Sequence, residues 1–272
     1  MIKNFKTVLI LFFFSLGCKS TSVNYKDYIQ KAEKLLKLRD TAEVINILAD
    51  AIHQYPDSAL AYRYRATIYL YNNKYNKALT DINTSIKLNS SDEENYIIRY
   101  KIYEKLGDVV EQIASLTAYI KVDSTNKEVY NQRGLLYEFI GDLDIALSDY
   151  NKALAIDSDF CIAHINRSLV FADLKRFDLA LNDCNTAIHL CPKEASAYFQ
   201  KGVVFVHLKE YLKALENFNK ADSIQPADKL TLFNRGIAYY YLKKMNEACR
   251  DWTTAGNLGD EEAKQYLEKY CK

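Results

Sequence analysis

The 272-residue sequence has little glycine, proline or histidine, with 8, 3 and 4 residues respectively. All-β folds need glycine and proline at their many tight turns, so the shortage of both argues against such a fold. The chain also lacks a phosphate-cradling glycine loop, a nucleophile elbow and a His-Glu-x-x-His pair. Nothing in it assembles a base, a nucleophile and an oxyanion donor. We therefore predict a protein without catalytic activity, metal or cofactor.

An excess of charge of either sign is also missing. Lys and Arg total 36 against 35 Asp and Glu, and no basic tract alternates with aromatic residues. Nucleic-acid binding needs such a basic surface, so it is not expected here. Apolar residues make up about half of the chain, which is enough to bury a continuous core.

The longest apolar run, from Thr7 to Gly17, is too short for a membrane span of ~20 residues. Lys3 and Lys6 precede it, so residues 1–17 are predicted to be an export signal. Gly17 before Cys18 resembles the lipobox of bacterial lipoproteins, although the two residues before Gly17 depart from the usual pattern. The resemblance implies that Cys18 is acylated (a palmitate-type modification) and that residues 18–24 form a tether. Ordinary secretion with cleavage nearby is the alternative.

Beyond the tether the sequence repeats with a period of 34 residues. The segment from Glu194 to Pro226 contains two stretches of helical period around a short polar turn, and it matches again when shifted by 34 in either direction. Such a period is typical of stacked helical hairpins. Seven repeats cover residues 25–260 and begin at residues 25, 59, 93, 127, 161, 195 and 229. Leu258-Gly259-Asp260 predicts a helix stop and a new N-cap, hence a capping helix over residues 261–272.

Position 8 of a repeat is mostly small, as in Gly202, and position 24 is mostly bulky, as in Phe218. This pattern resembles the tetratricopeptide repeat family. The resemblance implies an all-α solenoid of about seven helical hairpins plus the capping helix, and a protein that binds other proteins or peptide segments. The repeat at 93 departs from the pattern, with Tyr100, Gln112 and Tyr119 at three sites for small residues. Its hairpin is expected to be splayed or shifted.

Position 7 of every repeat is basic. In four repeats it is an arginine with an aspartate 16 residues later, namely Arg65 and Asp81, Arg133 and Asp149, Arg167 and Asp183, and Arg235 and Asp251. This row has two interpretations: the arginines bind an acidic ligand, or they form a set of structural ion pairs. The second is favoured because the acid appears together with the arginine.

The cysteines suit an oxidising envelope. Cys249 lies where the capping helix should cover it, and that helix contains Cys271, so a disulfide between them is one expectation and two free thiols the other. Cys161 and Cys191 should meet at the open end of one hairpin. They could form a second disulfide, remain unlinked, or bind a metal together with His164 and His189.

In tetratricopeptide arrays, positions 2, 5, 9, 12 and 13 line the concave surface. The resemblance places charged residues there in the early repeats and an apolar strip in the late ones. We predict that this strip is a groove for a partner. It contains Ile162, Ile165, Leu169, Phe199, Val203, Val206, Phe233, Ile237, Tyr240 and Tyr241. The Lys/Asn arrangement by which some members clamp a terminal carboxylate is missing, so a receptor for chaperone tails is disfavoured.

These observations indicate a protein-binding adaptor, lipid-anchored in the cell envelope. Lys19 favours the outer membrane, facing the periplasm, by analogy with lipoprotein sorting. Two alternatives remain. The chain could be a structural subunit of an outer-membrane assembly or secretion complex, or a metal or redox protein that uses the cluster around Cys161 and Cys191.

Overall fold

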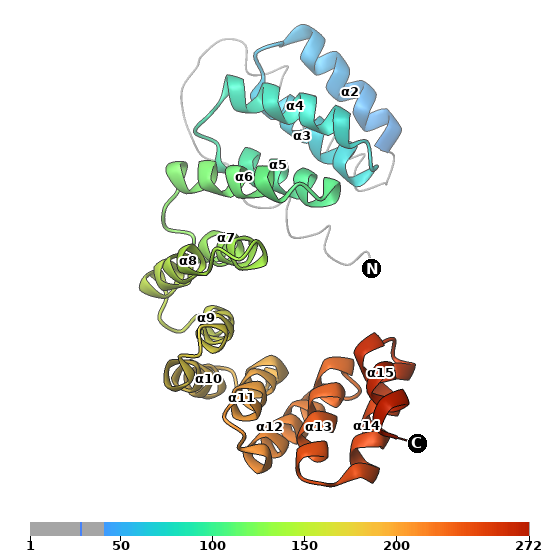
Figure 1. Ribbon diagram of the computed structural model, residues 1–272. Helices are drawn as coiled ribbons and strands as arrows, with labels where there is room; N and C mark the ends of the chain where they lie inside the picture. Colours follow the sequence, from blue (N-terminus) through green and yellow to red (C-terminus); the bar gives the residue numbers. More distant parts are fainter. Residues whose placement is uncertain (1–27, 29–40, 272) are drawn as a thin grey trace. The chain divides into compact units, whose positions relative to one another are not determined.

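The computed structural model describes Tyr28 and residues 41–271, and Figure 1 shows its helices. The described residues form fourteen α-helices and no strand, packed as consecutive hairpins. The prediction of an all-α solenoid is therefore confirmed. The export signal, Cys18, the tether and most of the first helix of the repeat at 25 lie outside the described residues.

The chain divides into two compact units between Asp108 and Val109. In the N-terminal unit the helices are α2 (Thr41–Gln54), α3 (Ala59–Tyr71), α4 (Tyr75–Leu88) and α5 (Glu93–Leu106). In the C-terminal unit they are α6 (Val109–Val122), α7 (Lys127–Phe139), α8 (Leu143–Ile156), α9 (Cys161–Asp173), α10 (Phe177–Leu190), α11 (Ala195–His207), α12 (Tyr211–Ile224), α13 (Lys229–Tyr241), α14 (Met245–Asn257) and α15 (Glu261–Tyr270). The division falls inside the repeat at 93, so its two helices belong to different units.

The helices follow the 34-residue period closely. The first helix of each repeat from 59 to 229 begins at the first residue of that repeat, and the second begins 16 residues later. The residue before the first helix supplies the N-cap in several repeats. Asn126 Oδ1 accepts from the Val129 amide at 3.2 Å, and Asp228 Oδ2 accepts from the Thr231 amide at 2.8 Å. Such caps satisfy amides at the start of a helix that have no partner within the helix.

In the repeats from 59 to 229 each hairpin turns through one residue in the left-handed conformation, at position 15. Gly141 adopts φ 86° there, and Lys209 adopts φ 60° in the equivalent place two repeats later. A residue with a Cβ atom is strained by roughly 1–2 kcal/mol in this conformation. The tight turn is therefore retained even in repeats that lack glycine.

In three repeats the two helices of a hairpin touch where a glycine faces an aromatic ring. A Cβ atom on Gly134 would lie 2.7 Å from the ring of Tyr150, and one on Gly202 would lie 2.6 Å from the ring of Phe218. Gly236 faces Trp252 in the same way. Position 8 is small for this reason, because the bulky side chain at position 24 fills the space above it.

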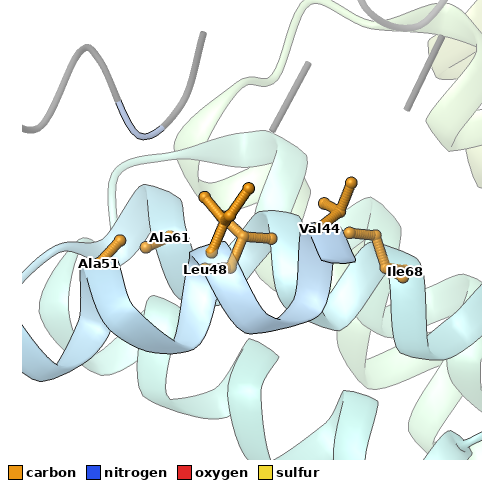
Figure 2. Packing of buried hydrophobic residues seen from close by; sticks show 6 residues of the cluster. Val44, Leu48, Ala51, Ala61 and Ile68 are labelled. Atoms are coloured by element: carbon orange, nitrogen blue, oxygen red, sulfur yellow. The ribbon is translucent and has the colours of Figure 1, made fainter. Parts of the chain in front are cut away.

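In the N-terminal unit aliphatic side chains fill the contact between α2 and α3. Val44, Leu48 and Ala51 of α2 pack against Ala61 and Ile68 of α3, and all five are buried (Figure 2). One apolar side of α2 thus meets the next hairpin. A helical hairpin cannot cover this side by itself, and its neighbour supplies the cover.

Helix α15 closes the last hairpin. Asp260 Oδ1 caps it by accepting from the Ala263 amide at 2.9 Å, after Gly259 ends the preceding segment at φ 86°. Tyr266 meets the ring of Trp252 at a centroid distance of 5.1 Å, with Trp252 itself fully buried. The chain at Cys271 is joined to Cys249 of α14 by a disulfide. The helix therefore covers an apolar end that would otherwise face water.

We predict that Gly202→Ala destabilises the protein by about 1–2 kcal/mol. The added methyl group favours the helix by up to ~1 kcal/mol, but crowding it against the buried Phe218 ring costs ~1–3 kcal/mol. Urea denaturation of the full chain measures the difference. The double variant Gly202→Ala/Phe218→Leu should recover part of the loss.

Gly256→Ala is the matched control, because its new methyl group would meet Cγ of the flexible Lys264 side chain at 3.2 Å. It should be neutral or stabilising. Equal losses in Gly202→Ala and Gly256→Ala would contradict the proposed role of the ring.

Candidate binding face of the C-terminal unit

The first helices of four successive repeats, α7, α9, α11 and α13, are neighbours in the C-terminal unit. α9 contacts both α7 and α11, and α11 contacts α13. A direct hydrogen bond of 3.0 Å from Asn166 Nδ2 to Asn131 Oδ1 joins α9 to α7. We call the solvent-facing side of these four helices the A-helix face.

The ten residues of the predicted groove differ in exposure. Ile165 and Phe233 are buried, at 5% and 7% exposed, whereas Ile162 and Tyr241 are 40% and 52% exposed. Six are half-buried: Leu169, Phe199, Val203, Val206, Ile237 and Tyr240. The structure thus offers a narrower strip than the sequence suggests, because Ile165 and Phe233 are not available at the surface.

Phe233 shows why helical position alone overestimates the exposed strip. Its ring packs edge-on against Tyr266 of the capping helix at a centroid distance of 5.2 Å. Ile165 packs with Ala187 and Ala197. Both residues occupy the predicted position of their repeats, but side chains of neighbouring helices cover them.

A second row on this face is absent from the sequence-based prediction. Position 6 of the four repeats carries a side-chain amide, in Gln132, Asn166, Gln200 and Asn234, and all four are half-buried. Position 9, one helical turn further on, carries Leu135, Leu169, Val203 and Ile237, also half-buried. The sequence contains this pattern, because position 6 is an amide in every repeat except those at 59 and 93, where it is Tyr64 and Ile98.

Two acidic side chains, Glu138 of α7 and Asp173 of α9, lie close enough to interact. Burial raises the pKa of Glu138, the hydrogen bond of 2.7 Å that it accepts from the hydroxyl of Tyr150 lowers it, and nearby Asp173 raises it, with a net rise. Burial and the same hydrogen bond raise the pKa of Tyr150 strongly.

The arginine row is structural, as predicted. Arg167 Nε and Nη2 donate to the two oxygens of Asp183 at 2.7 Å each. The same two-pronged pair forms in the other three repeats. The third nitrogen, Nη1, reaches back to the preceding repeat, to Asn151 from Arg167 and to Asn219 from Arg235. These arginines therefore link hairpins and are already engaged.

Asp183 also accepts from the ring of His164, at 3.0 Å from Nδ1. Burial alone would raise the pKa of Asp183. The hydrogen bonds from Arg167 and His164 outweigh that effect, so the pKa lies below its usual value. The folded state thus favours the charged carboxylate.

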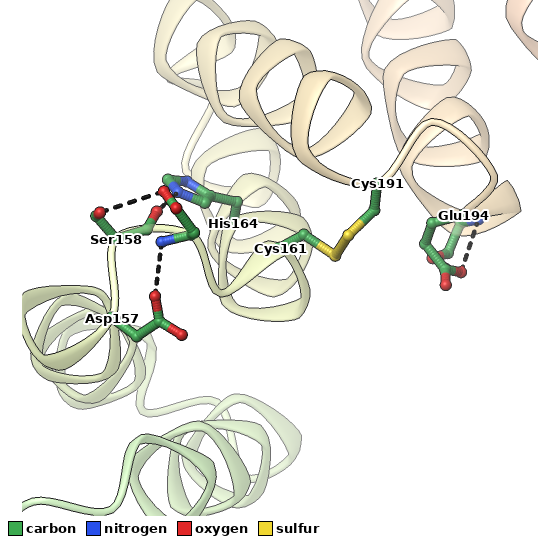
Figure 3. Close-up of a disulfide and its surroundings, with 8 residues drawn as sticks. Asp157, Ser158, Cys161, His164, Cys191 and Glu194 are labelled. Carbon is green, nitrogen blue, oxygen red and sulfur yellow. Dashed lines mark hydrogen bonds between the residues drawn. A yellow bond between two sulfur atoms is a disulfide. The ribbon is translucent and has the colours of Figure 1, made fainter.

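Figure 3 shows the cysteine cluster that the sequence left open. Cys161 and Cys191 are joined by a disulfide. The other ring nitrogen of His164, Nε2, lies 3.0 Å from the carbonyl oxygen of Ser158, so both nitrogens of His164 have protein partners. Across the described part of the chain no three metal-ligating side chains converge. The four residues therefore do not assemble as ligands, which corrects the metal hypothesis.

The remaining thiol in the described residues belongs to Cys184 in α10. It is fully buried at position 24, and burial raises its pKa to about 11. A thiol with that pKa is a poor nucleophile and metal ligand at neutral pH. Cys184 fills core space opposite Ser168.

Comparison with known proteins supports the same repeat register. A tetratricopeptide repeat family model matches residues 127–160 and 195–228. These two segments are similar to tetratricopeptide repeats, and the hairpins around them share their period. A comparison with curated proteins gives no match.

Several solved structures share the fold. A tetratricopeptide repeat protein from Parabacteroides merdae is 17% identical with a TM-score of 0.68, covering 91% of this chain and 99% of its own. PilW, a type IV pilus biogenesis factor, is 19% identical with a TM-score of 0.65, over 77% and 98%. YrrB, described as having an unusual peptide-binding site, is 22% identical with a TM-score of 0.58, over 68% and 95%. At these identities the likeness establishes the fold. Among residues 41–271, no helix is both long and apolar enough to cross a membrane.

We predict that Asp183→Asn destabilises the protein by about 2–3 kcal/mol at pH 7, because it leaves Arg167 without its buried partner. The folded-state pKa of Asp183 is lowered, so its contribution is present above the unfolded pKa of ~3.9 and is lost as pH falls through the folded value. The difference in free energy of unfolding between variant and wild type, measured by urea denaturation, should therefore become smaller below about pH 4.

Asp92→Asn serves as the control. Its ion pair with Arg63 is more exposed, with side-chain exposures of 23% and 20%, and should be worth less than ~1 kcal/mol. If Asp183→Asn lowers the free energy of unfolding no more than Asp92→Asn does, or if its effect does not change with pH, the pair of Asp183 with Arg167 does not have the proposed structural role.

Proposed function

We propose that this protein is a non-catalytic scaffold that holds a segment of a partner protein on the A-helix face of the C-terminal unit. The observation that carries the proposal is the row of half-exposed aliphatic side chains at position 9, which crosses four adjacent helices. A contiguous apolar surface of this kind is a common mark of an interaction site. The arginines that could have read an acidic ligand are engaged in structural pairs, which favours an apolar partner.

We further propose that the protein is a lipoprotein of the bacterial cell envelope, anchored through Cys18 in the outer membrane and facing the periplasm. The export signal and lipobox-like sequence support this proposal. The two disulfides fit an oxidising compartment. An anchor of this type would keep the repeats near the membrane surface.

We expect Leu169→Glu and Val203→Glu to weaken capture of the partner about tenfold, since each places a charge in the apolar row. The measurement is crosslinking in intact cells followed by purification and quantification of the crosslinked proteins. Leu179→Glu and Leu212→Glu are controls on α10 and α12, where the parent side chains are 47% and 64% exposed. These controls should retain the partner.

Circular dichroism must show that all four variants keep their helices. If folded Leu169→Glu and Val203→Glu retain every partner, the A-helix face is not the binding site. Several partners at low ratios would indicate an adaptor. One stable complex at a fixed ratio would instead indicate a structural subunit of an assembly.

If Cys18 is acylated, the wild type should incorporate labelled palmitate, and Cys18→Ser should abolish the label. Label that persists in Cys18→Ser, or a wild type without label, would exclude the lipobox interpretation.

A further inference from the structure

The turns of the last three hairpins carry lysine where the backbone favours glycine. Lys175, Lys209 and Lys243 occupy position 15 with φ of 58°, 60° and 63°. The repeats at 93 and 127 place Gly107 and Gly141 there, with φ of 74° and 86°. A side chain strains the left-handed conformation, and glycine relieves that strain. Three successive repeats therefore keep lysine where other repeats of the same array use glycine.

Position 16, which directly precedes the second helix, shows a related departure. An acidic residue is favoured there because it complements the positive end of the helix. Asp108 and Asp142 follow this preference in the repeats at 93 and 127, and Glu210 follows it in the repeat at 195. Arg176 and Lys244, the N-cap residues of α10 and α14, do not. Local preferences are typically broken where a residue serves a function.

The cations of these turns have no partner in the described part of the chain. All five are exposed, and their side chains form no hydrogen bond or ion pair with a described residue: Lys175, Arg176, Lys209, Lys243 and Lys244. An ion pair within the described chain therefore does not explain why cations replace glycine and aspartate. Their charges are available to an external ligand.

Ring stacking joins the three turns into one surface. Phe177 at the start of α10 stacks on His207 at the end of α11, with a centroid distance of 5.9 Å and an interplanar angle of 17°. Tyr211 stacks on Tyr241 in the next pair of repeats, at 4.7 Å and 7°. Successive turns are thereby held side by side. We call residues 173–179, 207–213 and 241–247 the turn edge.

The turn edge also exposes large apolar side chains. Leu212 and Tyr241 are more than half exposed, and Leu179 and Met245 are exposed as well. Each lies within three residues of a turn cation in the sequence. Leucine and tyrosine beside lysine are typical of a membrane interface, where apolar tips and tyrosine rings enter the headgroup region and lysine side chains extend to the phosphates.

We propose that the turn edge binds the surface of a lipid bilayer that contains anionic headgroups. The turn cations meet the headgroup phosphates, and Leu179 and Leu212 enter the boundary between headgroups and acyl chains. The turn edge contains six lysine and arginine residues against four acidic ones, and the acidic Glu210 is paired with Lys213. Its net charge is therefore complementary to an anionic surface. An acidic polypeptide would pair with the cations but would leave the leucines in water.

This inference goes beyond the proposed scaffold function and does not use the apolar row at position 9. It adds a second contact to the proposed acyl anchor. A single weak membrane signal binds reversibly, whereas two signals together anchor a protein stably. The turn edge would thus hold the C-terminal unit on the membrane surface.

The test measures contact between the turn edge and vesicles in the full-length protein. Leu212→Trp places a fluorophore on the turn edge, and the native Trp252 is fully buried. The matched control is Leu230→Trp, because Leu230 is 50% exposed at the other end of α13. The protein is collected by flotation with phosphatidylcholine vesicles that contain about 30% brominated phosphatidylglycerol, an anionic lipid that quenches tryptophan.

Quenching should be at least about threefold stronger in Leu212→Trp than in Leu230→Trp, because only the first side chain would enter the bilayer. With brominated phosphatidylcholine and no anionic lipid, quenching of Leu212→Trp should fall to the level of the control. Equal quenching of the two variants on anionic vesicles, or protein that does not float with them, would overturn the inference.

Replacing the three lysines by glycine separates membrane binding from a structural role. In the Leu212→Trp background, Lys175→Gly, Lys209→Gly and Lys243→Gly together remove three charges and relieve the strain of three turns. Quenching should fall to the level of Leu230→Trp, whereas the midpoint of thermal unfolding should be unchanged or higher. Unchanged quenching would overturn the inference. A fluorescence change of Leu212→Trp with polyglutamate, without quenching by vesicles, would identify an acidic polypeptide as the ligand and refute membrane contact.

Discussion

The structure depends on close approach between the two helices of each hairpin. In the C-terminal unit this approach is set by flat rings that lie directly on glycine, as Phe218 lies on Gly202. A side chain on the glycine would push the helices apart, and a smaller residue at position 24 would leave a cavity. Where position 8 is Ser168, position 24 is the small Cys184, so the two sites are matched within a repeat.

A second constraint joins one hairpin to the next. Arg167 and Arg235 bind the aspartate of their own repeat with two nitrogens and a side chain of the preceding repeat with the third. Because the guanidinium group is planar, these bonds restrict both the distance and the rotation between hairpins. These links help to hold α9 and α13 at fixed positions relative to the hairpins that precede them.

Much of this arrangement could be predicted from the sequence, because a repeat displays the same contact several times. The fit of Gly202 to Phe218 and the pairing of Arg167 with Asp183 both follow from one period of 34 residues. The burial of Phe233 could not be predicted that way, since it depends on Tyr266 of a helix outside the regular repeats. The hydrogen-bond partners of His164 could not be predicted from the sequence either, because one is a loop carbonyl and the other is a buried aspartate. Lys209 in a left-handed turn likewise violates the local preference that sequence reasoning relies on.

Each hairpin is stabilised mainly by its immediate neighbours, which keeps the A-helix face regular. Hydrogen–deuterium exchange of the full chain carrying Phe218→Ala measures this dependence, because that ring belongs to a core shared by α10, α11, α12 and α13. Protection should fall most in α11, α12 and α13 and change little in α7 and α8. An equal loss of protection from α7 to α14 would show a single cooperative core and would contradict this dependence.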